Sequence, residues 1–300
     1  MEKVYIKHHP SHAGKWIYKG YHSAWKELDY DVSFYNDFSE IEGEDYYLMA
    51  VDSDLTEPAF TAFKNSKKTF LFVRPTFFPR HWGTHPNFCY DKQKSWISRI
   101  KQMPNVLCWS FCETTQNNYF SEWGTVHTIP LAFDHLNYKF AENDKYKCDV
   151  CFIGGWANNG FDEKRKIMLN WMRPFVKSGL KCGFYVNRAV SHEFESLLLA
   201  NSTVSINIHD AYQQELGLDT NERSFKSLGL NGLLVSDNIR QIEQFLPQAK
   251  LTRTPEEMLQ AVLGYIEMDK QELRTLKEKN RNLVCENHTY MNRVEEFVKL

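Results

Sequence analysis

DTNERSFKSLGLNGLLVSD, residues 219–237, is the most informative stretch of this 300-residue chain. It reads as a polar loop, a short helix, a glycine-containing turn and a buried strand. Asn221, Arg223 and Ser224 place an amide, a guanidinium and a hydroxyl at the helix start. Because a helix N-terminus carries unpaired N–H donors and the positive end of a dipole, the stretch predicts an anion-binding site in an α/β protein.

Strand-like and helix-like runs alternate along almost the whole chain, which is typical of parallel α/β folds. Strands are predicted at residues 4–8, 32–35, 46–51, 69–73, 106–111, 148–153, 181–186, 204–208 and 233–236. Helices are predicted at residues 17–28, 57–65, 93–103, 163–177, 191–199, 224–228, 239–245, 255–268 and 271–300. The apolar periodicity lapses at 130–147, so we expect two Rossmann-like domains, 1–140 and 141–300, with a ligand cleft between them.

The composition narrows the class of protein. With 42% hydrophobic and 25% charged residues the chain is globular rather than disordered. No apolar run approaches the ~20 residues that span a bilayer, and the polar residues 1–7 do not resemble a signal peptide. Seven cysteines without a framework spacing predict free thiols and a cytoplasmic location.

Charge is unevenly distributed along the first half of the chain. Residues 27–57 carry eleven Asp or Glu and no Lys or Arg, whereas residues 64–101 carry nine Lys or Arg and one acid. Basic residues interleaved with aromatic ones suit nucleic acid, through phosphate neutralisation and base stacking. The alternative is a basic face that balances the acidic segment. The long basic and aromatic loop at 74–85 is the part of this segment that predicts a binding surface.

Three segments resemble the GT-B glycosyltransferases, specifically the family-1-like group that includes the CgeB-type spore-maturation proteins. They are DVCFIGGW (149–156), NERSFK with GLLVSD (221–226 and 232–237), and HTYMNR (288–293). The resemblance implies a GT-B fold of two Rossmann-like domains facing across a cleft, with C-terminal helices. It also implies a metal-independent transfer of a sugar from a nucleotide sugar, with a UDP-sugar as co-substrate and no further cofactor.

The resemblance assigns the donor to the C-terminal domain. The implied donor-binding residues are Gly154, Gly155, Asn221, Arg223, Ser224 and Lys226. Glycines after a buried strand let a phosphate approach the backbone closely, although a tight turn without a ligand would need them too. Lys226 departs from the family, which usually has Glu there to contact the hydroxyls of the donor. A lysine cannot accept those hydrogen bonds but can pair with a phosphate.

The acceptor is expected over the N-terminal domain. The candidate contacts are Arg74, Arg80, His81, Trp82 and His85. The acceptor is either a glycan, protein or small molecule, or a hydroxymethylated DNA base that has to be flipped out of the helix. His12, Asp52 and Glu113 follow predicted strands and are candidate general bases; the alternative for each is a solvated loop residue.

Three alternatives compete with this interpretation. Asp52-x-Asp54 resembles the metal site of GT-A transferases, although a helix N-cap explains the same residues and a second α/β half argues against GT-A. With Lys226 in place of Glu, the chain could instead be a non-catalytic nucleotide-sugar-binding module. Histidine and cysteine also recur at even spacing, but in a loop and on a strand rather than in a compact knuckle, so we predict no metal site (His81, His85, Cys89, Cys148, Cys151).

Overall fold

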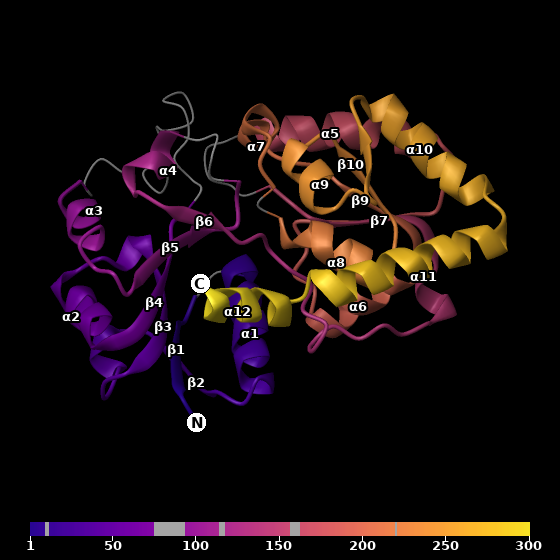
Figure 1. Cartoon of the computed structure of the whole chain (residues 1–300). Helices are drawn as coiled ribbons and strands as arrows, with labels where there is room; N and C mark the ends of the chain where they lie inside the picture. The colour runs from indigo at the N-terminus through magenta and orange to yellow at the C-terminus, as the bar shows by residue number, and fades with distance from the viewer. Residues whose placement is uncertain (10–11, 75–93, 114–117, 157–162, 220) are drawn as a thin grey trace. The chain divides into compact units, whose positions relative to one another are not determined.

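A computed structural model describes residues 1–9, 12–74, 94–113, 118–156, 163–219 and 221–300 (Figure 1). The chain forms two compact units, residues 1–131 with 290–300 and residues 132–289. The sequence predicts a boundary at residue 140, with all later residues in the second domain. In the structure the second unit begins at residue 132, and the last helix, within residues 290–300, belongs to the first unit.

The first unit is built on a parallel sheet with the strand order β2-β1-β3-β4-β5-β6. Its strands are β1 (Lys3–Lys7), β2 (Asp31–Tyr35), β3 (Tyr46–Val51), β4 (Ser66–Phe72), β5 (Val106–Ser110) and β6 (Val126–Thr128). All six residues of β3 are buried. A strand covered on both faces reads as a continuous apolar run, which is why the sequence predicted it.

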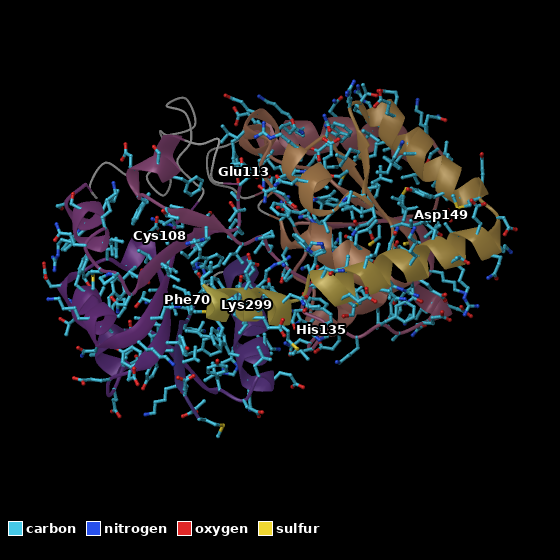
Figure 2. The ribbon with its side chains drawn as sticks, viewed as in Figure 1. Phe70, Cys108, Glu113, His135, Asp149 and Lys299 are labelled. Carbon is cyan, nitrogen blue, oxygen red and sulfur yellow. The ribbon has the colours of Figure 1, made fainter. Side chains whose placement is uncertain are left out.

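Helices cover both faces of this sheet (Figure 1). They are α1 (His12–Glu27), α2 (Glu57–Asn65), α3 (Lys94–Ile100), α4 (Asn118–Glu122) and α12 (Tyr290–Lys299), with short 3-10 turns η1 (Phe38–Glu40) and η2 (Asp52–Asp54). Phe297 of α12 packs on Phe70 of β4, which Figure 2 labels, with 4.7 Å between ring centroids. Tyr290 packs edge-on against Tyr21 of α1 at 4.7 Å. The C-terminal residues therefore complete the core of the N-terminal unit.

The second unit is built on a parallel sheet with the order β11-β10-β9-β7-β8. Its strands are β7 (Cys148–Gly154), β8 (Cys182–Val186), β9 (Ser202–Asn207), β10 (Leu234–Asp237) and β11 (Lys250–Thr252). Its helices are α5 (Glu163–Val176), α6 (His192–Ala200), α7 (Ala211–Leu216), α8 (Glu222–Leu230), α9 (Arg240–Phe245), α10 (Pro255–Glu267) and α11 (Lys270–Asn287), with the 3-10 turn η3 (Asp144–Tyr146). Apolar side chains of α5 and α10 pack on the sheet in one core cluster.

The turn between α8 and β10 requires glycine. Gly232 has φ +84°, and a Cβ built on it would lie 2.3 Å from the backbone oxygen of Lys277 in α11. Both the left-handed backbone and the close approach of α11 exclude a side chain here.

The expected helix at 271–300 is two helices. His288 ends α11 with φ −134° and ψ 41°, and Thr289 forms a backbone bridge with Phe133. The backbone N–H of Phe133 donates to the carbonyl of His288 at 2.7 Å. This pairing with a distant segment breaks the helix although the apolar pattern continues through it.

The two parallel sheets and their flanking helices confirm the predicted α/β class with two Rossmann-like halves. Within the described part of the chain, none of the helices combines the length and apolarity needed to cross a membrane.

Candidate functional site

The polar residues of the second unit gather at the carboxyl ends of its strands. Gly154 ends β7, Asn207 ends β9 and Asp237 ends β10. These three strands are neighbours in the sheet, and the first turn of α8 contacts the same edge through Ser224 and Arg223. The carboxyl edge of a parallel sheet is where α/β proteins bind ligands.

Arg223 contributes a cation to this edge. Its Nη1 donates to Oδ1 of Asn207 at 2.5 Å, and its Cζ lies 4.7 Å from the centroid of the Phe152 ring. Among the described residues no carboxylate forms an ion pair with this guanidinium. Burial lowers the pKa of this guanidinium, while the charges of Glu195, Asp219, Asp210 and Asp237 oppose the shift. A guanidinium has five N–H donors in a planar fork, a geometry that matches the oxygens of a phosphate.

Both predicted glycines lie where a side chain would collide with its neighbours. A Cβ built on Gly154 would lie 2.1 Å from Nη2 of Arg223, and one built on Gly155 would lie 1.8 Å from Oδ1 of Asn187. The absence of a side chain at 154 therefore lets the guanidinium lie directly on the end of β7.

The start of α8 adds further polar groups. Asn221 is the N-cap residue, and its side chain does not cap the helix. Its Nδ2 is buried and has no hydrogen-bond partner among the described residues. Ser224 is fully buried, and its Oγ accepts from Nδ2 of Asn207 at 2.9 Å. A buried amide donor next to the N–H groups of a helix start is a suitable contact for an anionic ligand.

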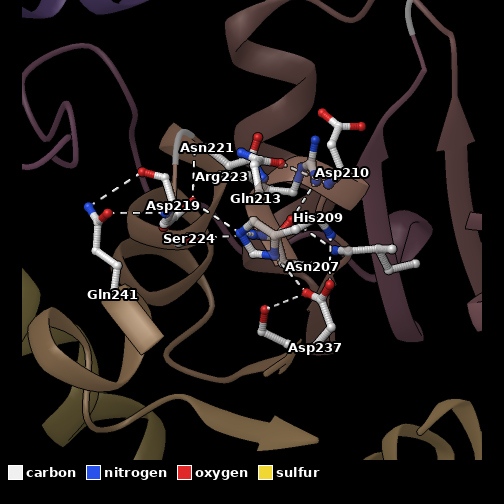
Figure 3. A network of polar contacts seen from close by, with 12 residues as sticks. Asn207, His209, Asp210, Gln213, Asp219, Asn221, Arg223, Ser224, Asp237 and Gln241 are labelled. Carbon is white, nitrogen blue, oxygen red and sulfur yellow. Dashed lines mark hydrogen bonds and ion pairs between the residues drawn. The ribbon is translucent and has the colours of Figure 1, made fainter. Parts of the chain in front are cut away.

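A buried charge cluster lies beside this helix start (Figure 3). His209 places Nδ1 2.6 Å from Oδ1 of Asp237 and Nε2 3.1 Å from Oδ1 of Asp219. Burial opposes the charge of His209, but the two carboxylates outweigh it and raise the pKa of the imidazole to about 9. Burial likewise opposes the charge of Asp237, yet His209 and its other donors lower the pKa of that carboxyl to about 2.

Lys226 belongs to a second buried cluster, between α6 and α8. Its Nζ lies 3.0 and 3.1 Å from the two carboxylate oxygens of Glu195 and 3.4 Å from Oε2 of Glu222. The hydroxyl of Tyr138 donates to Glu195 at 2.7 Å. Burial disfavours the ammonium, but both carboxylates raise the pKa of Lys226 above its usual value. The predicted contact of Lys226 with the donor stays a prediction, and these partners favour a structural role.

The candidate bases lie at the corresponding edge of the first unit. Asp52 follows β3, and its Oδ1 lies 2.5 Å from Nε of Arg74, which follows β4. Burial raises the pKa of Asp52 to about 6, although Arg74 opposes the shift. Glu113 follows β5 and is buried (Figure 2). His12 begins α1, and its side chain lies outside the described ones. Each of the three remains a candidate.

The carboxylates of the proposed GT-A metal site are paired with cations. Asp52 binds Arg74, and Asp54 lies 3.2 Å from Nζ of Lys7. In the ranges that the structure covers, no three His, Cys, Asp or Glu side chains gather closely enough to hold a metal ion. Four of the five predicted acceptor contacts lie outside the described residues (Arg80, His81, Trp82, His85).

Sequence reasoning missed the residues that hold the site together. Asn207 orients both Arg223 and Ser224, and His209 joins Asp219 to Asp237. The available signal was their position: Asn207 lies at the end of the predicted strand 204–208, and His209 and Asp210 directly follow it, where a parallel strand delivers its last residues to the ligand edge.

Comparisons with known proteins agree with this geometry. A family model described as glycosyl transferase-like matches residues 148–299. None of the curated protein sequences matches the chain significantly. Among solved structures, T4 phage β-glucosyltransferase with UDP-glucose has a TM-score of 0.60 at 10% identity and covers 98% of this chain and 97% of that one. The N-terminal domain of Candida albicans trehalose-6-phosphate phosphatase has a TM-score of 0.52 at 12% identity, covering 88% and 71%.

A glycosyltransferase of avilamycin A biosynthesis is also similar, with a TM-score of 0.52 at 10% identity over 100% of this chain and 96% of that one. At such identities the structural likeness shows the fold alone, and that fold is GT-B. The family model covers the unit that carries Gly154, Arg223 and α8, and its match does not test the narrower resemblance to CgeB-type proteins. The chain belongs to the glycosyl transferase-like family.

Proposed function

We propose that this protein transfers a sugar from a UDP-sugar to an acceptor, and that the diphosphate of the donor binds between Gly154, Arg223 and the first turn of α8. The observation that carries the proposal is the Arg223 guanidinium, which lies on the end of β7 and pairs with no carboxylate among the described residues. Negative charge grows on the departing nucleotide during transfer, so a fixed cation there lowers the barrier most.

The acceptor that we propose is a hydroxymethylated base in DNA. A structure described as the DNA modifying enzyme β-glucosyltransferase shares the fold of this chain end to end. Residues 74–85 combine basic and aromatic side chains, a composition that suits phosphates and bases, whereas Phe70 and Phe72 of β4 belong to the core. A glycan or protein acceptor is the alternative outcome of the acceptor experiment.

We also propose that transfer needs no metal ion, because Arg223 already supplies a fixed positive charge at the proposed diphosphate site. The T4 phage enzyme has been described in complex with UDP and Mn²⁺, so the question is open to a direct measurement. Transfer that is unchanged by EDTA supports metal independence, and transfer that EDTA abolishes and Mn²⁺ or Mg²⁺ restores contradicts it.

Donor binding is tested by thermal unfolding with nucleotides. UDP at 100 times its Kd should stabilise the protein by about 2.7 kcal/mol. For a chain of this size that is a rise in Tm of about 5 °C or more. ADP and GDP at the same concentration are the controls for base selectivity. If no nucleoside diphosphate or nucleotide sugar changes Tm, the donor site is misassigned.

Acceptor use is tested by transfer of labelled sugar from UDP-glucose and other UDP-sugars to duplex DNA. A duplex containing 5-hydroxymethylcytosine should be labelled, and an unmodified duplex of the same sequence should not. Binding to the duplex should weaken as salt rises, because phosphate contacts release counterions. Absence of both labelling and low-salt binding rejects the DNA acceptor. If the protein binds UDP but neither transfers the sugar to any acceptor nor hydrolyses the nucleotide sugar, the binding-module alternative is favoured.

Gly154→Ala should weaken UDP binding without unfolding the protein. The new methyl group would meet Nη2 of Arg223 at 2.1 Å and displace the guanidinium from the end of β7. The backbone at 154 is not in the left-handed region, so alanine introduces no backbone strain. We expect Kd for UDP to rise about tenfold, within the usual coupling range of neighbouring residues.

The matched control is Gly264→Ala in α10, where an added Cβ has no heavy atom within 4 Å. This variant should bind UDP normally and gain about 0.5–1 kcal/mol of stability from better helix propensity. An unchanged Kd in Gly154→Ala would show that the diphosphate does not lie against Arg223.

A further inference from the structure

We propose that His209 is a positioning residue of the donor site. Held as an imidazolium between Asp219 and Asp237, it fixes the start of α8. It thereby directs the guanidinium of Arg223 toward the end of β7. This inference rests on the proposed function, because the group that it positions is the proposed diphosphate contact.

The geometry around the ring supports a doubly protonated imidazole. Nδ1 lies 2.6 Å from Oδ1 of Asp237, and Nε2 lies 3.1 Å from Oδ1 of Asp219. The backbone N–H of His209 donates to the other oxygen of Asp237 at 3.0 Å. Each ring nitrogen faces a carboxylate oxygen, and an ionised carboxylate only accepts hydrogen bonds. Both nitrogens must therefore carry a proton to complete the two contacts.

Asp219 connects the ring to the helix start. Its Oδ1 accepts from His209 and also from the backbone N–H of Asn221, at 2.8 Å. Gln241 holds the same loop, with its Oε1 accepting from the N–H of Asp219 at 3.2 Å. Removal of the ring proton would leave the buried Asp219 carboxylate with one donor fewer.

Asn207 connects the ring to Arg223. Its Oδ1 accepts from Arg223 and its Nδ2 donates to Ser224, while Nδ2 also lies 3.4 Å from Nε2 of His209. With a proton on Nε2, the ring offers Asn207 no acceptor, and the amide stays directed at Ser224. Without that proton, Nε2 becomes a competing acceptor for the amide that orients Arg223.

Charged groups from several neighbouring elements surround the His209 imidazole and affect its protonation. Asp237 comes from β10, Asp219 from the loop before α8 and Arg223 from α8. From α5, Lys164 donates to the carbonyl of Ile208 at 2.6 Å and lies 3.5 Å from Oδ1 of Asp210, the residue after His209. Burial lowers the pKa of Lys164, so the ammonium of this lysine also titrates below its usual range.

The sign of the pH dependence follows from the raised pKa of His209, about 9. In the unfolded chain the pKa of this histidine is about 6.5, so folding is accompanied by uptake of a proton at neutral pH. The stabilisation is complete below about pH 6.5 and is lost as the pH rises through about 9. Ordering of the α8 start, and UDP affinity with it, should decline over the same alkaline range.

The experiment measures Kd for UDP from pH 6.5 to 10 in the wild type and in His209→Gln. We expect the UDP affinity of the wild type to fall as the pH passes about 9, which we call the alkaline step. The variant should bind UDP about tenfold more weakly at pH 7 and should lack the alkaline step. The comparison also cancels the titration of UDP itself. Gln214→Ala removes a neutral donor to Asp237 (2.7 Å) and should keep the alkaline step.

A second measurement covers the case in which His209→Gln does not fold. In wild-type protein with ¹⁵N-labelled histidine, NMR should show both ring nitrogens of His209 protonated at pH 8. A singly protonated ring at that pH overturns the proposal, as does an alkaline step that persists in His209→Gln. If wild-type protein does not bind UDP at any pH, the proposed function fails together with this inference.

Discussion

Arg223→Ala should lower kcat for sugar transfer by about 10²–10³-fold, the usual cost of removing one preorganised donor to developing charge. The guanidinium lies over Phe152 and is oriented by Asn207, so its position is set before the donor arrives. An interaction that grows as the nucleotide departs acts on kcat more than on KM. Steady-state kinetics with a saturating acceptor separates the two effects.

Arg223→Lys tests whether charge alone suffices. A lysine keeps the charge but loses the planar fork that matches phosphate oxygens, so it should recover only part of the lost rate. Arg274→Ala is the matched control, because this exposed arginine of α11 forms an ion pair with Glu278 one turn away, and such pairs contribute little. A folded Arg223→Ala protein with kcat within twofold of the wild type would show that Arg223 does not contact the leaving group.

The parts of the fold that the sequence predicted well are those governed by local pattern. The alternation of apolar and polar residues at 204–208 predicted the buried strand β9, and the polar start at 221 predicted α8. The strands β6 and β11 were missed because three residues are too few to show a period. The break before α12 was missed because its cause is the pairing of Thr289 with Phe133, which is distant in sequence.

The same limit applies to the candidate site. Arg223 and the glycines were predicted because a glycine turn and a polar helix start carry a local signature. The network that supports them has no local signature, because the second carboxylate that contacts His209, Asp237, lies 28 residues away in the sequence. Similarly, Lys226 has its main counterion on another helix, at Glu195. A sequence shows that a charge is present, and only the fold shows what neutralises it.

That difference changes what a substitution at 226 can report. With glutamate at 226, three carboxylates would share one buried cluster, because Glu195 and Glu222 already lie there. Breaking a buried ion pair costs about 3–5 kcal/mol, and the repulsion adds to this. Lys226→Glu should therefore lower Tm by about 10 °C or more, as measured by thermal unfolding of the full chain.

The charge-swapped double variant Lys226→Glu with Glu195→Lys separates stability from donor choice. It restores one opposite-charge pair between α6 and α8, so it should recover most of the lost Tm, whereas Glu195→Gln alone should not stabilise the wild type. If the double variant is folded and its preference among UDP-sugars differs from that of the wild type, residue 226 contacts the donor as well as stabilising α8. If Lys226→Glu alone unfolds at the wild-type temperature, the cluster contributes no stability, and the ion pair with Glu195 does not hold the two helices together.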